Sequence, residues 1–205
     1  AGSYCPYRRS AAVSPLRCPA GSFCNGTNMP APIPCPAGRY NPAPGAVSEA
    51  SCTRCYDGTT CLPYGQAAPT TCPAGSYCRS PDRAPVPCPA GSYNALTGSI
   101  TNADCLPCTV AHYCPRGSTQ PQPCSAGLFS GSTSQSACAP CAAGFVAPSA
   151  GAASCTPCGP GFTSSSDSTK CVQLKCVPFI FDPSTFNCFN PVALAFLILG
   201  YVVSV

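Results

Sequence analysis

Large and charged side chains are scarce in this 205-residue chain. It contains no Trp, one Met and one His, and Asp, Glu, Lys and Arg together make up 8% of it. A nucleic-acid partner is not expected, because there is no basic stripe with interleaved aromatics. The six acidic residues are scattered, and nothing around His112 favours a catalytic or metal-binding role. We therefore expect neither an enzyme nor a bound cofactor.

Cysteine, proline and glycine are abundant instead. The chain has 21 Cys, 27 Pro and 18 Gly, and cysteine at this frequency is typical of a disulfide scaffold. Cross-links then replace a broad apolar core, because they limit the entropy of the unfolded chain. Disulfides at this density persist in oxidising compartments, so the sequence predicts a secreted or surface-displayed protein.

A repeat covers most of the chain. The phrase Cys-Pro-Ala-Gly-x-aromatic and its degenerate versions begin nine times, at Cys18, Cys35, Cys55, Cys72, Cys88, Cys108, Cys124, Cys141 and Cys158. Pro restricts φ after the cysteine, and Gly three residues on permits a turn with positive φ. Such repeats touch mainly their neighbours. We expect a small disulfide-rich fold over residues 1–171, an elongated tandem array of short irregular β hairpins and turns.

An aromatic residue stands at the fifth or sixth position of eight repeats. These residues are Phe23, Tyr40, Tyr77, Tyr93, Tyr113, Phe129, Phe145 and Phe162. We expect each ring to stack on the adjacent disulfide or on the next repeat, which predicts a packing ladder rather than a ligand site.

Every repeat has a second cysteine, in one of two places. It follows the sixth position in the pairs Cys18/Cys24, Cys55/Cys61, Cys72/Cys78 and Cys108/Cys114. It comes later in the pairs Cys35/Cys52, Cys88/Cys105, Cys124/Cys138, Cys141/Cys155 and Cys158/Cys171. One disulfide per repeat is the economical prediction. Cys5 is expected to pair with a cysteine two residues upstream of Ala1 or within the same local group.

Four cysteines come near the spacing of a zinc ribbon: Cys138-x2-Cys141-x13-Cys155-x2-Cys158. They lie, however, in a train of repeats that has the same C-x2-C junction elsewhere without a second pair. The sequence therefore favours disulfides over a metal site.

With these residues in view, the repeat resembles the ephrin-receptor-like cysteine-rich repeat of receptor ectodomains and of protist and algal surface proteins. The four CPAG phrases and the C-x2-C junctions of residues 1–171 carry the resemblance. Residues 35–78 are also similar to a tumour necrosis factor receptor module, which implies crossed pairs Cys55–Cys72 and Cys61–Cys78. Cys35–Cys52 and Cys88–Cys105 are the same under both schemes, and the choice between local and crossed pairing stays open. The composition is similar to that of membrane-anchored components of algal ciliary hairs (mastigonemes).

The pattern changes after Cys171. Residues 172–190 contain Cys176 and Cys188, spaced to close a small Phe-rich loop. Residues 191–205 are uncharged, and we expect an apolar helix that starts a transmembrane or membrane-docking segment. Its membrane-facing residues are predicted to be Val192, Leu194, Phe196, Leu197, Ile198 and Leu199. A glycolipid-anchor signal or a segment docking on a partner are the alternatives.

Two classes of function fit this sequence. The first is a structural extracellular stalk, the membrane-proximal part of a filament or coat on the plasma or ciliary membrane, with other chains of the assembly as partners. The second is a ligand-binding or adhesion ectodomain of a cysteine-rich receptor, although few large side chains are available for a binding hot spot. The sequon Asn25-Gly26-Thr27 predicts a surface glycan at Asn25.

Overall fold

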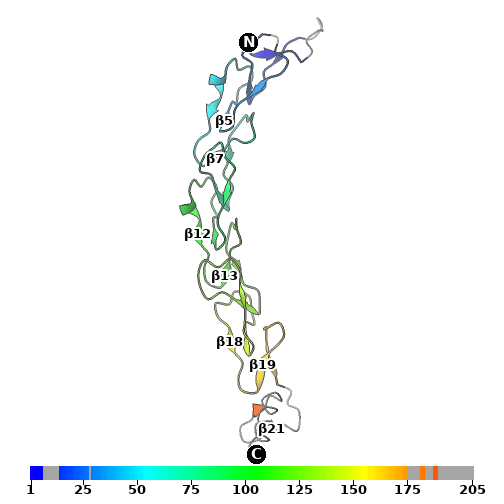
Figure 1. Ribbon diagram of the computed structural model, residues 1–205, viewed down its shortest axis with the longest axis vertical. Helices are drawn as coiled ribbons and strands as arrows, with labels where there is room; N and C mark the ends of the chain where they lie inside the picture. The colour runs from blue at the N-terminus through cyan, green and yellow to red at the C-terminus, as the bar shows by residue number, and fades with distance from the viewer. Residues whose placement is uncertain (7–13, 28, 175–180, 183–186, 189–205) are drawn as a thin grey trace, which may run out of the picture. The chain divides into compact units, whose positions relative to one another are not determined.

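A computed structural model of the chain describes residues 1–6, 14–27, 29–174, 181–182 and 187–188 (Figure 1). It divides into two compact units, Ala1–Cys108 with Cys114–Pro121 and Thr109–Tyr113 with Gln122–Val205. Within each compact unit the hairpins follow one another in sequence order. The prediction of a small disulfide-rich fold built from short antiparallel hairpins is confirmed.

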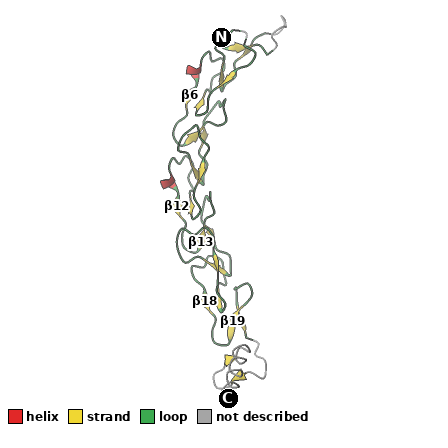
Figure 2. Ribbon diagram, in the orientation of Figure 1, coloured by secondary structure: helices red, strands yellow, loops and turns green. Residues whose placement is uncertain are grey.

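Each sheet is a two-stranded antiparallel hairpin, and most strands are two residues long (Figure 2). The first compact unit contains β1 (Ser3–Tyr4) with β2 (Leu16–Arg17), β3 (Ser22–Phe23) with β4 (Ile33–Pro34), β5 (Arg39–Tyr40) with β6 (Thr53–Arg54), β7 (Thr59–Thr60) with β8 (Thr70–Thr71), β9 (Ser76–Tyr77) with β10 (Val86–Pro87), and β11 (Ser92–Tyr93) with β12 (Leu106–Pro107). The second contains β13 (His112–Tyr113) with β14 (Gln122–Pro123), β15 (Leu128–Phe129) with β16 (Ala139–Pro140), β17 (Phe145–Val146) with β18 (Thr156–Pro157), β19 (Phe162–Ser164) with β20 (Cys171–Gln173), and β21 (Phe181–Asp182) with β22 (Asn187–Cys188). Two 3-10 turns, η1 (Glu49–Ser51) and η2 (Asn102–Asp104), are the helical segments of the described residues.

The glycine at the fourth position of the repeat sets the start of each hairpin. Gly21, for example, has φ 79°, and its carbonyl accepts a hydrogen bond of 2.8 Å from the N–H of Cys35. The same bond joins the fourth residue of each repeat to the cysteine that opens the next, at 2.7 to 3.1 Å. The Cys108 repeat has Ala111 at this position, with φ 64°. Since a Cβ atom disfavours positive φ, Ala111 is the strained member of the series.

Proline closes the second strand of many hairpins, at the residue directly before the next cysteine. The six cases are Pro34, Pro87, Pro107, Pro123, Pro140 and Pro157. Backbone groups alternate in direction along an antiparallel strand. Because the following cysteine points its N–H at the first strand, the preceding residue points away from it. Proline therefore stands where no hairpin bond is lost, and it removes the outward donor that another strand would need.

The aromatic positions behave in two ways. Phe23, at the sixth position, is 6% exposed and packs against Cys35 and Cys52 of the next repeat. Phe145 and Phe162 stand one residue earlier and are 41% and 47% exposed. Since side chains alternate across a strand, a shift of one residue turns the ring to the other face. Val146 takes the buried place at 5% exposure, so the expected ladder of rings does not extend to these two residues.

The predicted C-terminal features lie outside the described residues. These are the apolar helix over 191–205, with Val192, Leu194, Phe196, Leu197, Ile198 and Leu199, and Cys176 of the Phe-rich loop. Of Cys188, the structure describes its backbone place in β22. In the described part of the chain, no helix has the length and apolar character to cross a membrane.

Candidate functional site

Nine disulfides staple the described repeats, and each lies within one repeat. They are Cys18–Cys24, Cys35–Cys52, Cys55–Cys61, Cys72–Cys78, Cys88–Cys105, Cys108–Cys114, Cys124–Cys138, Cys141–Cys155 and Cys158–Cys171. Their Cα–Cα distances of 5.7 to 6.4 Å lie in the ordinary range for disulfides. The crossed pairs Cys55–Cys72 and Cys61–Cys78 are not formed, and Cys5 has a free thiol among the described residues.

The junction between consecutive repeats is made of backbone hydrogen bonds, which we call rungs. Between the Cys18 and Cys35 repeats, the first rung runs from Gly21 N–H to Asn41 C=O at 2.7 Å. The second runs from Cys24 N–H to Ala46 C=O at 2.9 Å, and the third from Gly45 N–H back to Cys18 C=O at 2.7 Å. The Cys18 repeat is thus held to the next one by backbone groups.

The three rungs recur at four junctions of the first compact unit and at one of the second, at 2.7 to 3.2 Å. The first rung is donated by Gly21, Gly38, Gly75, Gly91 and Gly127. The second is donated by Cys24, Asn41, Cys78, Asn94 and Ser130. The third is donated by Gly45, Gly65, Gly98, Gly117 and Gly151, all with positive φ. The spacing of glycines in the sequence is thereby explained by two uses, one at the start of a hairpin and one in the docking loop of the following repeat.

Repeats two apart also come into contact, through these glycines. A Cβ atom built on Gly21 would lie 2.0 Å from the Gly65 carbonyl oxygen. Cβ atoms on Gly58 and Gly75 would lie 2.3 Å from the carbonyl oxygens of Gly98 and Gly117. These distances are far below a van der Waals contact, so only glycine fits where one backbone passes over another.

Two buried asparagines replace the second cysteine in repeats that lack the short disulfide. Asn41 and Asn94 are 3% and 1% exposed, and each stands seventh in its repeat, where Cys24 and Cys78 stand in theirs. Their Nδ2 groups donate to the carbonyls of Ser22 and Ser76 in the preceding repeat, both at 3.1 Å. The sequence reasoning missed them, although the recurrence of Asn directly after CPAG-x-Tyr is visible in the sequence.

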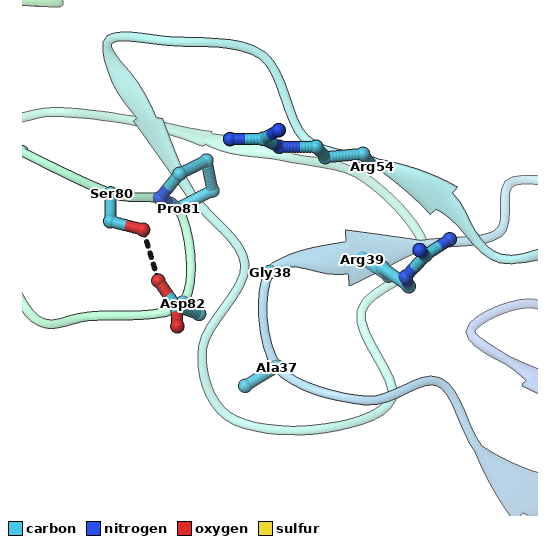
Figure 3. Close-up of a pocket in the computed structure, with 7 residues that line it drawn as sticks. All are labelled: Ala37, Gly38, Arg39, Arg54, Ser80, Pro81 and Asp82. Carbon is cyan, nitrogen blue, oxygen red and sulfur yellow. Dashed lines mark hydrogen bonds between the residues drawn. The ribbon is translucent and has the colours of Figure 1, made fainter.

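The first compact unit has a small polar cleft. It has a volume of about 260 Å³ and is lined by Ala37, Gly38, Arg39, Arg54, Ser80, Pro81 and Asp82 (Figure 3). The Arg54 side chain extends toward the loop of Asp82, whereas the Arg39 guanidinium points away and donates to Cys52 C=O at 2.8 Å. The Ser80 hydroxyl, with smaller contributions from nearby groups that include Arg83 and Arg54, lowers the pKa of Asp82. Arg39 and Asp82 are thus bonded to groups of the repeats themselves.

The remaining predicted sites belong to different repeats. Asn25 and Thr27 of the sequon are exposed just after Cys24. His112 Nδ1 lies 2.9 Å from Val110 C=O and 3.3 Å from Thr109 Oγ1. Among the described residues, no group of His, Cys, Asp or Glu side chains is arranged to bind a metal ion. Cys138, Cys141, Cys155 and Cys158, with their zinc-like spacing, all lie in disulfides.

Taken together, the nine disulfides and the short hairpins define a small disulfide-rich repeat protein. This class is typical of secreted or extracellular proteins and of structural or binding domains rather than enzymes. Comparison with models of known protein families gives no match, and comparison with curated protein sequences gives none.

Proposed function

We propose that this chain is a structural extracellular stalk without enzymatic activity. It is the membrane-proximal part of a surface filament or coat, on the plasma membrane or a ciliary membrane. The observation that supports this most is the three-rung junction, because it joins successive repeats through the backbone. A load along the chain is shared between the disulfide inside each repeat and the rungs between repeats.

The magnitudes suit a mechanical element. A rung contributes about 1 kcal/mol, so a complete junction contributes about 3 kcal/mol before packing is counted. A disulfide that closes a loop of about 15 residues adds about 3 kcal/mol in the loop-entropy model. The outward-facing prolines, such as Pro34 and Pro87, leave strand edges without a donor. Lateral strand addition to these edges is thereby disfavoured.

Imaging of the native assembly tests the stalk proposal. Antibody-labelled electron microscopy of intact cells is expected to place the chain at the base of a regular filament or within a continuous coat. Isolated single molecules, with no filament or coat attached, would overturn the proposal. Enzymatic release of glycans followed by mass spectrometry of the Asn25 peptide checks the predicted glycan in the same material.

Membrane attachment is assigned to residues 191–205, and other chains of the filament or coat are the remaining partners. Arg substitutions at Leu197 and Ile198 in the full chain are expected to release it from the membrane fraction of expressing cells. Leu96→Arg is the matched control, because Leu96 is 70% exposed in the repeats. Equal membrane retention of the native chain, the Leu197→Arg, Ile198→Arg variant and the Leu96→Arg control would contradict anchoring by this segment.

Ligand binding by a receptor ectodomain is the second candidate. Two exposed tyrosines of the Cys55 repeat favour it, since Tyr56 and Tyr64 are 61% and 66% exposed and tyrosine is enriched in binding hot spots. A Tyr56→Ala, Tyr64→Ala variant would then lose cell-surface binding of its partner while keeping its disulfides. Under the stalk proposal, the variant assembles into the filament or coat as the native chain does.

A further inference from the structure

One junction in each compact unit keeps only the second of the three backbone rungs. Between the Cys55 and Cys72 repeats this is the second rung, Cys61 N–H to Pro81 C=O at 2.9 Å. Between the Cys141 and Cys158 repeats it is again the second, Ala147 N–H to Ser168 C=O at 2.9 Å. At the latter, the Gly144 N–H bonds to the Ser164 hydroxyl at 3.2 Å instead of to a carbonyl. We call these two the open junctions. A further junction, between the Cys108 and Cys124 repeats, keeps only the first rung, Ala111 N–H to Ser130 C=O at 2.8 Å.

Both open junctions carry the same local sequence where complete junctions have glycine. The loops are Ser80-Pro81-Asp82 and Ser165-Ser166-Asp167. In each, the serine hydroxyl donates to the aspartate carboxylate two residues on. Each loop is also closed by a backbone bond to its own serine carbonyl, from Arg83 N–H at 3.2 Å or Ser168 N–H at 2.9 Å. A complete junction has the same backbone turn, from Ser118 N–H to Pro115 C=O at 3.2 Å, so the bond from serine to aspartate is what the two open loops have in addition.

We infer that the Ser-x-Asp loops make the open junctions into joints, at which the array separates locally before the complete junctions beside them do. The stability of a repeat array is roughly a sum of terms for each repeat and each interface. Local opening therefore begins at the weakest interface, and an interface with one rung is weaker than one with three. The inference concerns the array alone, so it holds whether the chain is a stalk or a receptor.

Hydrogen exchange of the intact, disulfide-bonded chain tests this with a matched pair of amides. Cys61 and Cys78 occupy the same place in their repeats, and each donates a second rung of 2.9 Å. The Cys61 rung lies at an open junction and the Cys78 rung at a complete one. After correction for intrinsic rates, Cys61 is expected to exchange at least about tenfold faster than Cys78, which corresponds to about 1.4 kcal/mol. Equal protection of the two amides would overturn the inference.

Substitutions in the loops test whether the Ser-x-Asp sequence is what weakens the open junctions. Asp82→Gly removes the carboxylate that binds the Ser80 hydroxyl and is expected to slow exchange at Cys61. Leu96→Ser with Gly98→Asp places the Ser-x-Asp sequence in a complete junction and is expected to accelerate exchange at Cys78 more than Gly98→Ala does. Gly98→Ala is the control, because Gly98 has φ 78° and both variants carry the cost of a side chain at positive φ, while a Cβ there meets nothing closer than Thr71 Cγ2 at 3.8 Å. If neither variant changes exchange at its junction, the loops are not the cause and the inference fails, whatever imaging shows about the stalk.

Discussion

Gly21→Ala is the substitution that most directly tests the packing of repeats two apart. The backbone at Gly21 has φ 79°, which costs an alanine about 1 to 2 kcal/mol. Its Cβ would also lie 2.0 Å from the Gly65 carbonyl oxygen. The Gly65 loop must then move, which breaks the rung from Gly65 N–H to Cys35 C=O and costs about 1 kcal/mol more. The local loss is expected to reach about 3 kcal/mol.

Gly144→Ala provides the control, because it has the same backbone conformation without the contact. Gly144 has φ 81°, and among the described residues no atom lies within 4 Å of a Cβ built there. It is expected to cost about 1 to 2 kcal/mol, the conformational part alone. Ala111→Gly is the reverse change and is expected to stabilise its hairpin by about 1 kcal/mol, because Ala111 already has φ 64°.

Hydrogen exchange is the suitable assay, since unfolding of a repeat array does not obey a two-state model. In Gly21→Ala, the Gly65 amide is expected to exchange about a hundredfold faster than in the native chain. In Gly144→Ala, the Ala147 amide at its own junction is expected to exchange only about tenfold faster, which is the effect of positive φ alone. Equal effects of the two substitutions, each measured at its own junction, would refute the steric reasoning and leave only the cost of positive φ.

Three further results are expected. Asn94→Ala should destabilise its junction by about 2 kcal/mol in the same assay, because it leaves the half-buried Ser76 carbonyl and the Leu96 N–H without their side-chain partner. Under mild reduction followed by alkylation and mass spectrometry, Cys158–Cys171 should open before Cys35–Cys52, since Cys171 is exposed whereas Cys35 and Cys52 are 0% exposed. The Ser165 hydroxyl and then the Thr169 N–H lower the pKa of Asp167 to about 2, so its stabilising effect is present above pH 3.8 and is lost as the pH falls toward 2.

Each of these has a contradicting outcome. Exchange rates in Asn94→Ala equal to those of the native chain would show that the amide does not hold the junction. Simultaneous reduction of the two disulfides would show that the exposure of the cysteines does not set the order in which the disulfides are reduced. An NMR titration in which Asp167 titrates near 3.8, or an Asp167→Asn variant with the same acid sensitivity as the native chain, would contradict the hydrogen-bonded turn.

Much of the local structure was predictable from sequence. The phrase CPAG-x-aromatic predicted hairpins of fixed length, since Pro restricts φ and Gly permits positive φ, each at a defined position. It also predicted one disulfide per repeat as the simplest pairing. The buried Asn41 and Asn94 were missed because asparagine is usually a surface or turn residue. Phe145 and Phe162 were assigned to the packing ladder because the fifth and sixth positions were treated alike, whereas a strand sends them to opposite faces.

The amino-acid sequence by itself determined the class of protein, because abundant cysteine with few large apolar residues leaves cross-linking as the main means of stabilising a fold. It also determined the short hairpins, which depend on neighbouring residues. Tertiary structure alone decided the rungs between repeats, the contacts of Gly21 with Gly65 and the open junction at Asp82. Those features join residues about 20 to 45 positions apart through backbone groups, which are nearly the same in every residue, so the sequence alone does not say which of these groups will meet.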